Sequence, residues 1–161
     1  MGILAKMPSV YQYLSKTEED TALLGKRLAQ IAQTGDIFAL FGTLGMGKSV
    51  LSRAFIQNYM GEIDVPSPTF TLLQTYEAPD FEIYHFDLYR LKHPDEIFEI
   101  GMEEAMYGGV CLIEWPEKMG GYLPKRAVKV TFSQEKDGRL ISFETADAAC
   151  ADRLQKLSDI K

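Results

Sequence analysis

The fold is decided by the stretch Phe38-Ala-Leu-Phe-Gly-Thr-Leu-Gly-Met-Gly-Lys-Ser-Val-Leu51. It contains Gly42-x-x-x-x-Gly47-Lys48-Ser49, a complete phosphate-binding loop. The apolar run 37–41 predicts a buried strand before the loop, and residues 50–56 predict a helix after it. In that arrangement the backbone N–H groups of the loop and the helix N-terminus bind an anion. A glycine-rich turn that binds nothing is disfavoured, because every defining position is matched between a strand and a helix.

Lys48 and Ser49 carry the chemistry expected of this loop. The lysine can reach the β- and γ-phosphates of a nucleotide, and the serine hydroxyl can ligate Mg²⁺. The loop glycines permit backbone angles and close approach that a Cβ would block. The chain has no guanine-specifying Asn-Lys-x-Asp run. We therefore expect ATP and Mg²⁺ to be bound here.

Composition limits the class of protein. At 161 residues, the chain is expected to form a single P-loop ATPase domain over 1–161, with residues 1–7 as a leader. The net charge of −6 argues against a free-standing DNA or RNA binder. The two cysteines lack a disulfide or metal-site spacing, which favours a reducing, cytoplasmic setting. No apolar run has the length of a membrane helix, so we expect no membrane role.

Hydrophobic patterning predicts the other elements. Strands are expected at 8–14, 70–76, 82–89, 110–113, 127–132 and 140–144. Helices are expected at 17–34, 93–106 and 147–157. The pairs 70–76 with 82–89 and 127–132 with 140–144 are spaced as antiparallel hairpins, which predicts a mixed sheet.

Three short segments admit more than one interpretation. The stretch from Glu18 to Thr21 either caps a helix or lies near an adenine base. Ser67-Pro-Thr69-Phe70 is either a loop that senses the γ-phosphate or a proline turn that packs Phe70 into the core. Residues 85–87 predict either an aspartate acting on Mg²⁺-bound water or a histidine and aspartate that bind a metal or each other.

The second key stretch is Val110-Cys-Leu-Ile-Glu114-Trp115-Pro116. Four apolar residues followed by an acid are typical of a buried strand that delivers a carboxylate beside Mg²⁺. A carboxylate at the end of a buried strand needs a partner, which the metal would supply. The alternative is a strand that emerges into solvent at Glu114. Trp115 is expected near the site, on a partner-facing surface or in the core.

Four motifs occur in order: Gly-Thr-Leu-Gly-Met-Gly-Lys-Ser at 42–49, Ser-Pro-Thr-Phe at 67–70, His-Phe-Asp-Leu-Tyr-Arg at 85–90 and Ile-Glu-Trp-Pro at 113–116. Together they resemble the bacterial TsaE (YjeE) family, the ATPase of tRNA threonylcarbamoyladenosine biosynthesis. The resemblance implies a three-layer α/β/α P-loop NTPase fold with a mixed parallel and antiparallel sheet. It also implies action with TsaB and TsaD, which transfer a threonylcarbamoyl group to a tRNA adenosine, so that tRNA is met only through that complex.

The resemblance also assigns roles to positions. Ser49 and Glu114 match metal positions, and Asp87 matches an aspartate that acts on metal-bound or attacking water. Thr69 matches the switch-like loop, and Glu18 matches a nucleotide-contacting region only loosely. The implied catalytic residues are Lys48, Thr69, Asp87 and Glu114, and the implied metal residues are Ser49, Asp87 and Glu114. The implied nucleotide-binding residues are Gly42, Thr43, Leu44, Gly45, Met46, Gly47, Lys48, Ser49, Val50 and Glu18.

The expected reaction is in-line attack of water on the γ-phosphate, with Lys48 and Mg²⁺ spreading the developing charge. No arginine is assignable to the site, since Arg90 is only the nearest candidate by motif and Arg53 is expected on a helix surface. A site without a fixed arginine predicts slow hydrolysis alone and faster hydrolysis with partners. The alternatives are a small-molecule or nucleoside kinase, a nucleotide-dependent switch with negligible catalysis, and a metalloenzyme centred on His85 and Asp87.

Overall fold

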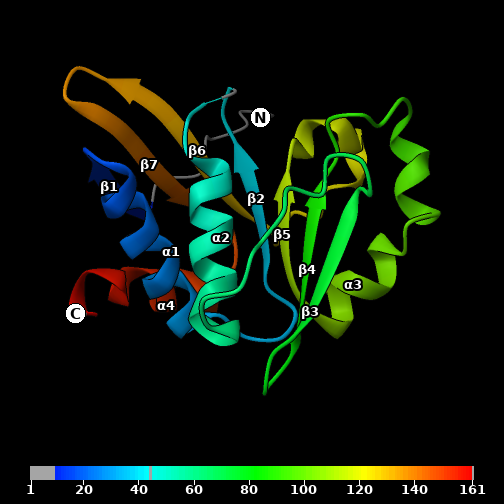
Figure 1. Cartoon of the computed structure of the whole chain (residues 1–161), viewed down its shortest axis with the longest axis horizontal. Helices are drawn as coiled ribbons and strands as arrows, with labels where there is room; N and C mark the ends of the chain where they lie inside the picture. Colours follow the sequence, from blue (N-terminus) through cyan, green and yellow to red (C-terminus); the bar gives the residue numbers. More distant parts are fainter. Residues whose placement is uncertain (1–9, 44, 161) are drawn as a thin grey trace, which may run out of the picture.

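A computed structural model describes residues 10–43 and 45–160 (Figure 1). The leader expected at 1–7 and the loop residue Leu44 lie outside these ranges. The described strands are β1 Tyr11–Ser15, β2 Ile37–Phe41, β3 Leu73–Glu77, β4 Glu82–Asp87, β5 Gly109–Glu114, β6 Val128–Glu135 and β7 Gly138–Glu144. The α-helices are α1 Glu18–Ile31, α2 Lys48–Met60, α3 Met102–Gly108 and α4 Ala148–Gln155. Short 3-10 helices are η1 Pro94–Phe98, η2 Pro116–Tyr122 and η3 Lys156–Asp159.

The described strands form one 7-stranded sheet in the order β1-β7-β6-β2-β5-β4-β3. Its centre is parallel, because β2 pairs in parallel with both β5 and β6, and β4 pairs in parallel with β5. Its edges are antiparallel, through β3 on β4 at one side and through β7 and β1 beyond β6 at the other. Both predicted hairpins are present, and the predicted α/β P-loop fold with a mixed sheet is confirmed.

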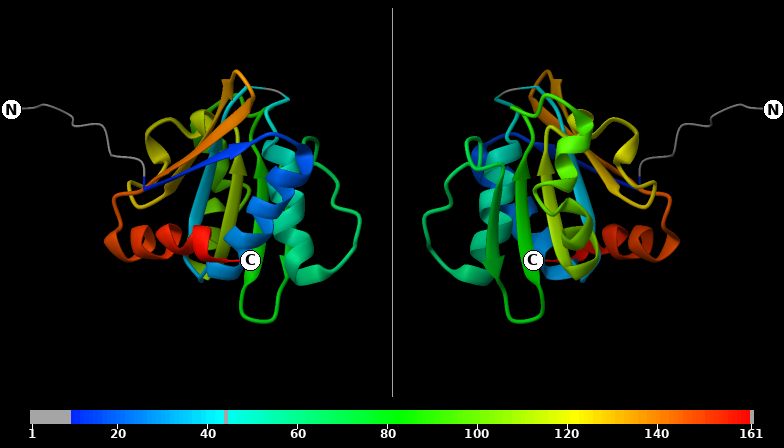
Figure 2. Two further views of the ribbon diagram at one scale, coloured as in Figure 1. Left: turned by 90° about the vertical axis from the view of Figure 1, so that its left-hand side faces the viewer. Right: turned by 90° about the vertical axis from the view of Figure 1, so that its right-hand side faces the viewer.

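Alternating side chains of the central strands build a core on each face of the sheet. On one face Phe38, Leu40 and Leu112 pack in a cluster with residues of α1 and α2. On the other face Cys111 and Ile113 join residues of η1, α3 and η2. Figure 2 shows α1 and α2 side by side on the first face. His85, Asp87 and Glu114 follow the alternation of that same face, so their side chains are directed toward α2.

The start of α1 follows from local capping. The Thr17 side chain accepts a hydrogen bond from the Asp20 backbone N–H at 3.1 Å, and the acidic first turn complements the helix dipole. The helix ends at Ile31, ahead of Gly35, whose φ of 94° lies in the left-handed region. Among the described residues, no helix has both the length and the apolar character needed to cross a membrane.

Two predicted elements differ from the structure. The single helix expected at 93–106 is divided into η1 and α3, because Gly101 takes a φ of 78° that a continuous helix cannot contain. The strand expected from Phe70 begins only at Leu73, because Leu72 has a φ of 66° and its N–H bonds to Pro68 O, which closes a turn. Both differences arise from backbone angles that hydrophobic periodicity does not report.

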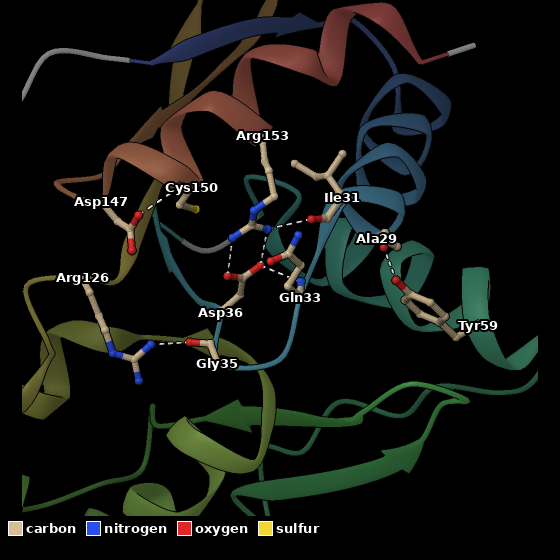
Figure 3. A network of polar contacts seen from close by, with 10 residues as sticks. All are labelled: Ala29, Ile31, Gln33, Gly35, Asp36, Tyr59, Arg126, Asp147, Cys150 and Arg153. Atoms are coloured by element: carbon tan, nitrogen blue, oxygen red, sulfur yellow. Dashed lines mark hydrogen bonds and ion pairs between the residues drawn. The ribbon is translucent and has the colours of Figure 1, made fainter.

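A polar network closes the end of the sheet where β2 begins (Figure 3). Arg153 of α4 donates from Nη1 and Nη2 to the two carboxylate oxygens of Asp36, at 2.7 and 2.8 Å. The same guanidinium donates to Ile31 O, and the Gln33 N–H also donates to Asp36. Arg126 donates to Gly35 O and Met106 O. Residues distant in sequence, Arg126 and Arg153, are therefore tied to the segment that leads into the central strand.

Candidate nucleotide-binding site

The glycine loop connects β2 directly to α2. Gly47 is the N-cap residue of α2 with a φ of 99°, which favours glycine, and no side chain caps the helix there. The first N–H groups of a helix have no partner within the helix, and they carry the positive end of its dipole. The start of α2 therefore offers donors for an anion at the carboxyl end of the parallel strands.

Lys48 is buried beneath this loop. Its Nζ donates to Gly42 O at 2.6 Å and lies 3.8 Å from the centroid of the Trp115 ring. Burial lowers the pKa of Lys48, and the negative charges of Glu114, Glu117 and Asp87 act in the opposite direction. Its partners are thus a backbone carbonyl and an aromatic face, which a phosphate can replace.

Glu114 ends β5 with its side chain fully inside the protein, only 3% exposed as a residue. Ser49 Oγ donates to Glu114 Oε1 at 3.2 Å, and His85 Nε2 lies 2.6 Å from Glu114 Oε2. The alternative in which Glu114 emerges into solvent is wrong. His85 pairs with Glu114 rather than with Asp87, so the predicted histidine–aspartate contact is also wrong.

Asp87 ends the neighbouring strand β4 and pairs in register with Glu114. Its Oδ2 accepts hydrogen bonds from Thr69 Oγ1 at 3.0 Å and Ser67 Oγ at 3.4 Å. Its Oδ1 accepts the Tyr89 N–H at 3.0 Å. The proline-framed loop is thereby held against the end of β4 by its two hydroxyls.

Among the described residues, neither Asp87 nor Glu114 forms an ion pair with a lysine or arginine. Two buried carboxylates without a fixed cationic partner are costly unless a cation joins them. Mg²⁺ prefers oxygen ligands and usually takes only one or two from the protein beside those of a phosphate. The Ser49 hydroxyl and the Glu114 carboxylate fit that donor set.

These groups line one cavity of about 520 Å³. From the predicted set it is lined by Glu18, Gly45, Met46, Gly47, Lys48, Ser49, Val50, Thr69, Asp87 and Glu114. Gly42 and Thr43 do not line it, because Gly42 lies beneath the loop as the acceptor for Lys48 and Thr43 points to solvent. Leu44 lies outside the described residues.

Sequence reasoning missed two residues of this cavity, Tyr89 and Arg139, whereas Thr21 belongs to the candidate adenine-side stretch 18–21. Thr21 faces Gly47 from α1 and shares a 2.6 Å hydrogen bond with Ser15. Arg139 of β7 pairs in register with Ser15, and its buried Nε has no hydrogen-bond partner among the described residues. No local signal marks Arg139, since only the place of β7 in the sheet brings it to the cavity.

The predicted arginine candidate lies elsewhere. Arg90 stacks on the Phe70 ring at 4.2 Å from its centroid and does not line the cavity. Phe70 is 81% exposed, so the alternative that it packs into the core is wrong. Arg53 lies on the exposed surface of α2, as predicted. The described residues also contain no group of three or more His, Cys, Asp or Glu placed to hold a metal by themselves.

Comparison with known proteins places the chain in a family. The family model "Threonylcarbamoyl adenosine biosynthesis protein TsaE" matches residues 15–141. The tRNA threonylcarbamoyladenosine biosynthesis protein TsaE of Rickettsia felis is 44% identical over 86% of this chain and 83% of its own length. The protein of the same name in Bacillus subtilis is 34% identical over 78% of this chain and 79% of its own.

A solved structure agrees with this result. The crystal structure of Bacillus subtilis YdiB superposes with a TM-score of 0.79 at 26% identity, covering 96% of this chain and 97% of that one. The family match includes the glycine loop, the two buried carboxylates Asp87 and Glu114, and the proline-framed loop 67–70. The chain therefore belongs to the TsaE family of tRNA threonylcarbamoyladenosine biosynthesis proteins.

Proposed function

We propose that the chain is a Mg²⁺-dependent ATPase that hydrolyses ATP slowly alone and faster with TsaB and TsaD, in the biosynthesis of threonylcarbamoyladenosine in tRNA. One observation carries the proposal. Asp87 and Glu114 are buried side by side at the start of α2, where hydroxyls and a histidine contact them instead of a lysine or arginine. A nucleotide-bound divalent cation satisfies such a pair, whereas a purely structural site would leave it uncompensated.

The phosphates are bound by the loop and the first turn of α2. Residues 45–49 line the cavity, and their backbone N–H groups would donate to phosphate oxygens. Lys48 exchanges Gly42 O and the Trp115 ring for the β- and γ-phosphates, where its charge offsets the charge that develops in the transition state. This exchange costs little, because a neutral carbonyl and a ring are weaker partners than a phosphate.

The metal is held by Ser49 and Glu114. When bound, Mg²⁺ neutralises charge on the β- and γ-phosphates and polarises the phosphorus for attack. Ser49 would ligate the metal through a lone pair of its oxygen while its hydroxyl proton stays on Glu114. Glu114 keeps one oxygen on His85 and presents the other toward Ser49.

Asp87 and Thr69 orient the attacking water. The Asp87 carboxylate is fixed by the Tyr89 N–H and by the Thr69 hydroxyl, so that its remaining acceptor sites face the cavity. A fixed carboxylate within reach of a water is the arrangement that positions a nucleophile. Thr69 belongs to an exposed loop, which makes this orientation sensitive to whatever docks against that loop.

The expected stimulation by partners is based on the positions of the arginines relative to Asp87 and Glu114. The cavity arginine, Arg139, comes from the α1 side through the pairing of β7 with β1, whereas Asp87 and Glu114 come from the opposite side of β2. Arg90, at the end of β4, is stacked on Phe70. A γ-phosphate without an arginine beside it is hydrolysed slowly until one is supplied.

The test is phosphate release from ATP by the purified chain, with and without TsaB–TsaD and with Mg²⁺ or excess chelator. We expect slow release that requires Mg²⁺ and is stimulated by the partners, and loss of threonylcarbamoyladenosine formation over repeated turnovers with Glu114→Ala. A fast basal rate that ignores the partners contradicts the proposal. Phosphorylated nucleoside in place of free phosphate would instead support the kinase alternative.

The Glu114→Ala variant also distinguishes the proposed ATPase from a nucleotide-dependent switch that does not need catalysis. If Glu114→Ala abolishes turnover but supports modification as well as the unaltered chain, hydrolysis has no role and ATP binding alone suffices. If ATP-dependent association with TsaB–TsaD survives in that variant while repeated turnover is lost, hydrolysis is the step that the partners require. Association is measured by pull-down with and without ATP.

A further inference from the structure

We propose that His85 is a positioning residue for the metal ligand Glu114. The inference rests on the proposed Mg²⁺ site and adds a residue to it that acts only through Glu114. The histidine holds one carboxylate oxygen so that the other faces Ser49 and the cavity. It is thus expected to set the affinity for the divalent cation without contacting the cation or the nucleotide.

The geometry of the pair supports this role. His85 and Glu114 are 2% and 3% exposed, and the contact between Nε2 and Oε2 is 2.6 Å. Glu114 Oε1 is 3.2 Å from Ser49 Oγ. Because a carboxylate only accepts hydrogen bonds, Nε2 carries the proton and donates it to Oε2. The two carboxylate oxygens thereby have different tasks.

Lys48 is an alternative partner for Glu114, which explains why the carboxylate has to be held in place by His85. Lys48 is the nearest buried cation, and the charge of Glu114 acts on it. A direct ion pair between them would remove Lys48 from the phosphates and Glu114 from the metal. No such ion pair is found among the described residues. With Oε2 held by β4, the carboxylate is kept on the Ser49 side.

The other ring nitrogen argues against a purely structural role. His85 Nδ1 is buried without a hydrogen-bond partner among the described residues. An unsatisfied buried polar atom costs about 1–3 kcal/mol, which a histidine chosen only for stability would avoid. Within the described part of the chain, the imidazole has one polar contact, with Glu114. Residues in this second layer fix the orientation of metal ligands, and their loss typically weakens metal binding about 10–100-fold.

The experiment measures Mn²⁺ binding to the full chain with ADP, by electron paramagnetic resonance, so that the readout does not depend on hydrolysis. We expect His85→Leu to weaken Mn²⁺ binding about 10-fold. His85→Gln should stay within about 3-fold, because the glutamine amide N–H₂ reaches the position of Nε2. ADP affinity in the presence of chelator should be unchanged in both variants. Mn²⁺ binding by His85→Leu that equals the unaltered chain would overturn the inference.

Ser52→Ala is the matched control, because it removes a fully buried hydroxyl of α2 that also lacks a partner. It should leave Mn²⁺ binding unchanged. Should His85→Leu fail to fold, the comparison is made between His85→Gln and His85→Asn, whose amide reaches only the Nδ1 position. Equal Mn²⁺ affinities in that pair contradict the inference.

Glu114→Gln separates this inference from the proposed function. Loss of Mn²⁺ binding with Glu114→Gln but not with His85→Leu leaves the metal site standing and rejects only the role of His85. Absence of Mn²⁺ binding by the unaltered chain with ADP rejects the metal site itself. Weakened Mn²⁺ binding in Ser52→Ala equal to that of His85→Leu would show a general effect of cavity formation and would also reject the role of His85.

Discussion

At the two ends of the parallel strands, the buried carboxylates have different kinds of hydrogen-bond partner. At the end where β2 begins, Asp36 is bonded through both oxygens to Arg153, which is a permanent partner (Figure 3). At the end where β4 and β5 finish, Asp87 and Glu114 have hydroxyls, a backbone N–H and a histidine. The first end has a fixed arginine partner, whereas among the described residues no lysine or arginine pairs with the acids at the second.

Backbone conformation follows the same division. Among the described residues, the non-glycine residues with positive φ are Leu72 and Trp115. Leu72 O accepts the Asp87 N–H, and Trp115 follows Glu114 directly. A non-glycine residue whose backbone is held in the left-handed region costs about 1–3 kcal/mol, and such strain persists where function requires it. A fixed ion pair thus lies at one end of the sheet, and backbone strain and acids without a lysine or arginine partner lie at the other.

The largest test of this comparison is Lys48→Ala. It removes the charge nearest the phosphates, so we expect the hydrolysis rate to fall on the order of 10²–10³-fold. The urea unfolding midpoint should not fall, because the buried amine has only a carbonyl and an aromatic ring as partners. Phosphate release and urea unfolding are the measurements. Lys26→Ala, on the exposed surface of α1, is the control. An equal loss of activity in Lys26→Ala and Lys48→Ala would refute the prediction.

Arg153→Ala should have the opposite profile. The side chains of Arg153 and Asp36 are 19% and 10% exposed, so Asp36 would lose its cation in a largely buried place. We expect a loss of about 2–3 kcal/mol in the free energy of unfolding, with the hydrolysis rate per folded molecule unchanged. Chemical unfolding of this variant is compared with Asp152→Ala, an exposed change on the same helix. Equal free energies of unfolding for the two variants would show that the network of Arg153 and Asp36 does not stabilise the fold.

Thr69→Val tests the loop that faces Asp87. Valine keeps the shape of threonine but removes the hydroxyl that donates to Asp87 at 3.0 Å. We expect kcat to fall about 10-fold with KM for ATP nearly unchanged, because hydrogen bonds to charged groups are worth about 1.5–3 kcal/mol. Steady-state kinetics at saturating Mg²⁺ measure both constants. Thr71→Val, an exposed change in the same loop, should retain the original kcat, and a rise in KM alone for Thr69→Val would contradict this role.

Arg139→Met tests the arginine that register brings to the cavity. We expect ATP to bind about 5-fold more weakly, because a buried, unpaired Nε–H becomes a donor to the nucleotide, a contact worth about 1 kcal/mol. The fluorescence of Trp115, the single tryptophan of the chain, reports binding, since its ring contacts Lys48. Lys136→Met in the same hairpin is the control. An unchanged affinity would remove Arg139 from the site.

The last expected effect is a pH dependence at the end of the sheet where β2 begins, and it is confined to alkaline pH. Burial, reinforced by the charge of Asp36, raises the pKa of the Cys150 thiol from 9.0 to about 11. A raised folded-state pKa means that the folded state holds its proton more tightly, so the contribution is complete below pH 9.0 and is lost as the pH rises toward 11. Urea unfolding at a series of pH values tests this. Cys150→Ala should lack that part of the decline, and an identical pH profile would contradict the assignment.

Local chain properties made much of the fold predictable. The glycine loop, the buried strand before it and the hydroxyl after Lys48 are contiguous, and each depends on backbone freedom or polarity over a few residues. Thr17 and the acidic turn behind it marked the start of α1 in the same way. Glu114 was found because four apolar residues precede it in one strand. By contrast, the break at Gly101 and the delayed start of β3 depend on single backbone angles that packing imposes.

The residue types and their order along the chain therefore determined the nucleotide loop, the family and the acids at the ends of β4 and β5. The tertiary structure alone decided which side chains meet. It paired His85 with Glu114 rather than Asp87, brought Arg139 of β7 to the cavity, and gave Asp36 the arginine that Glu114 lacks. The physical reason is that strand pairing and helix packing join positions that are distant in sequence, and a one-residue shift in a strand would turn its side chains to the opposite face.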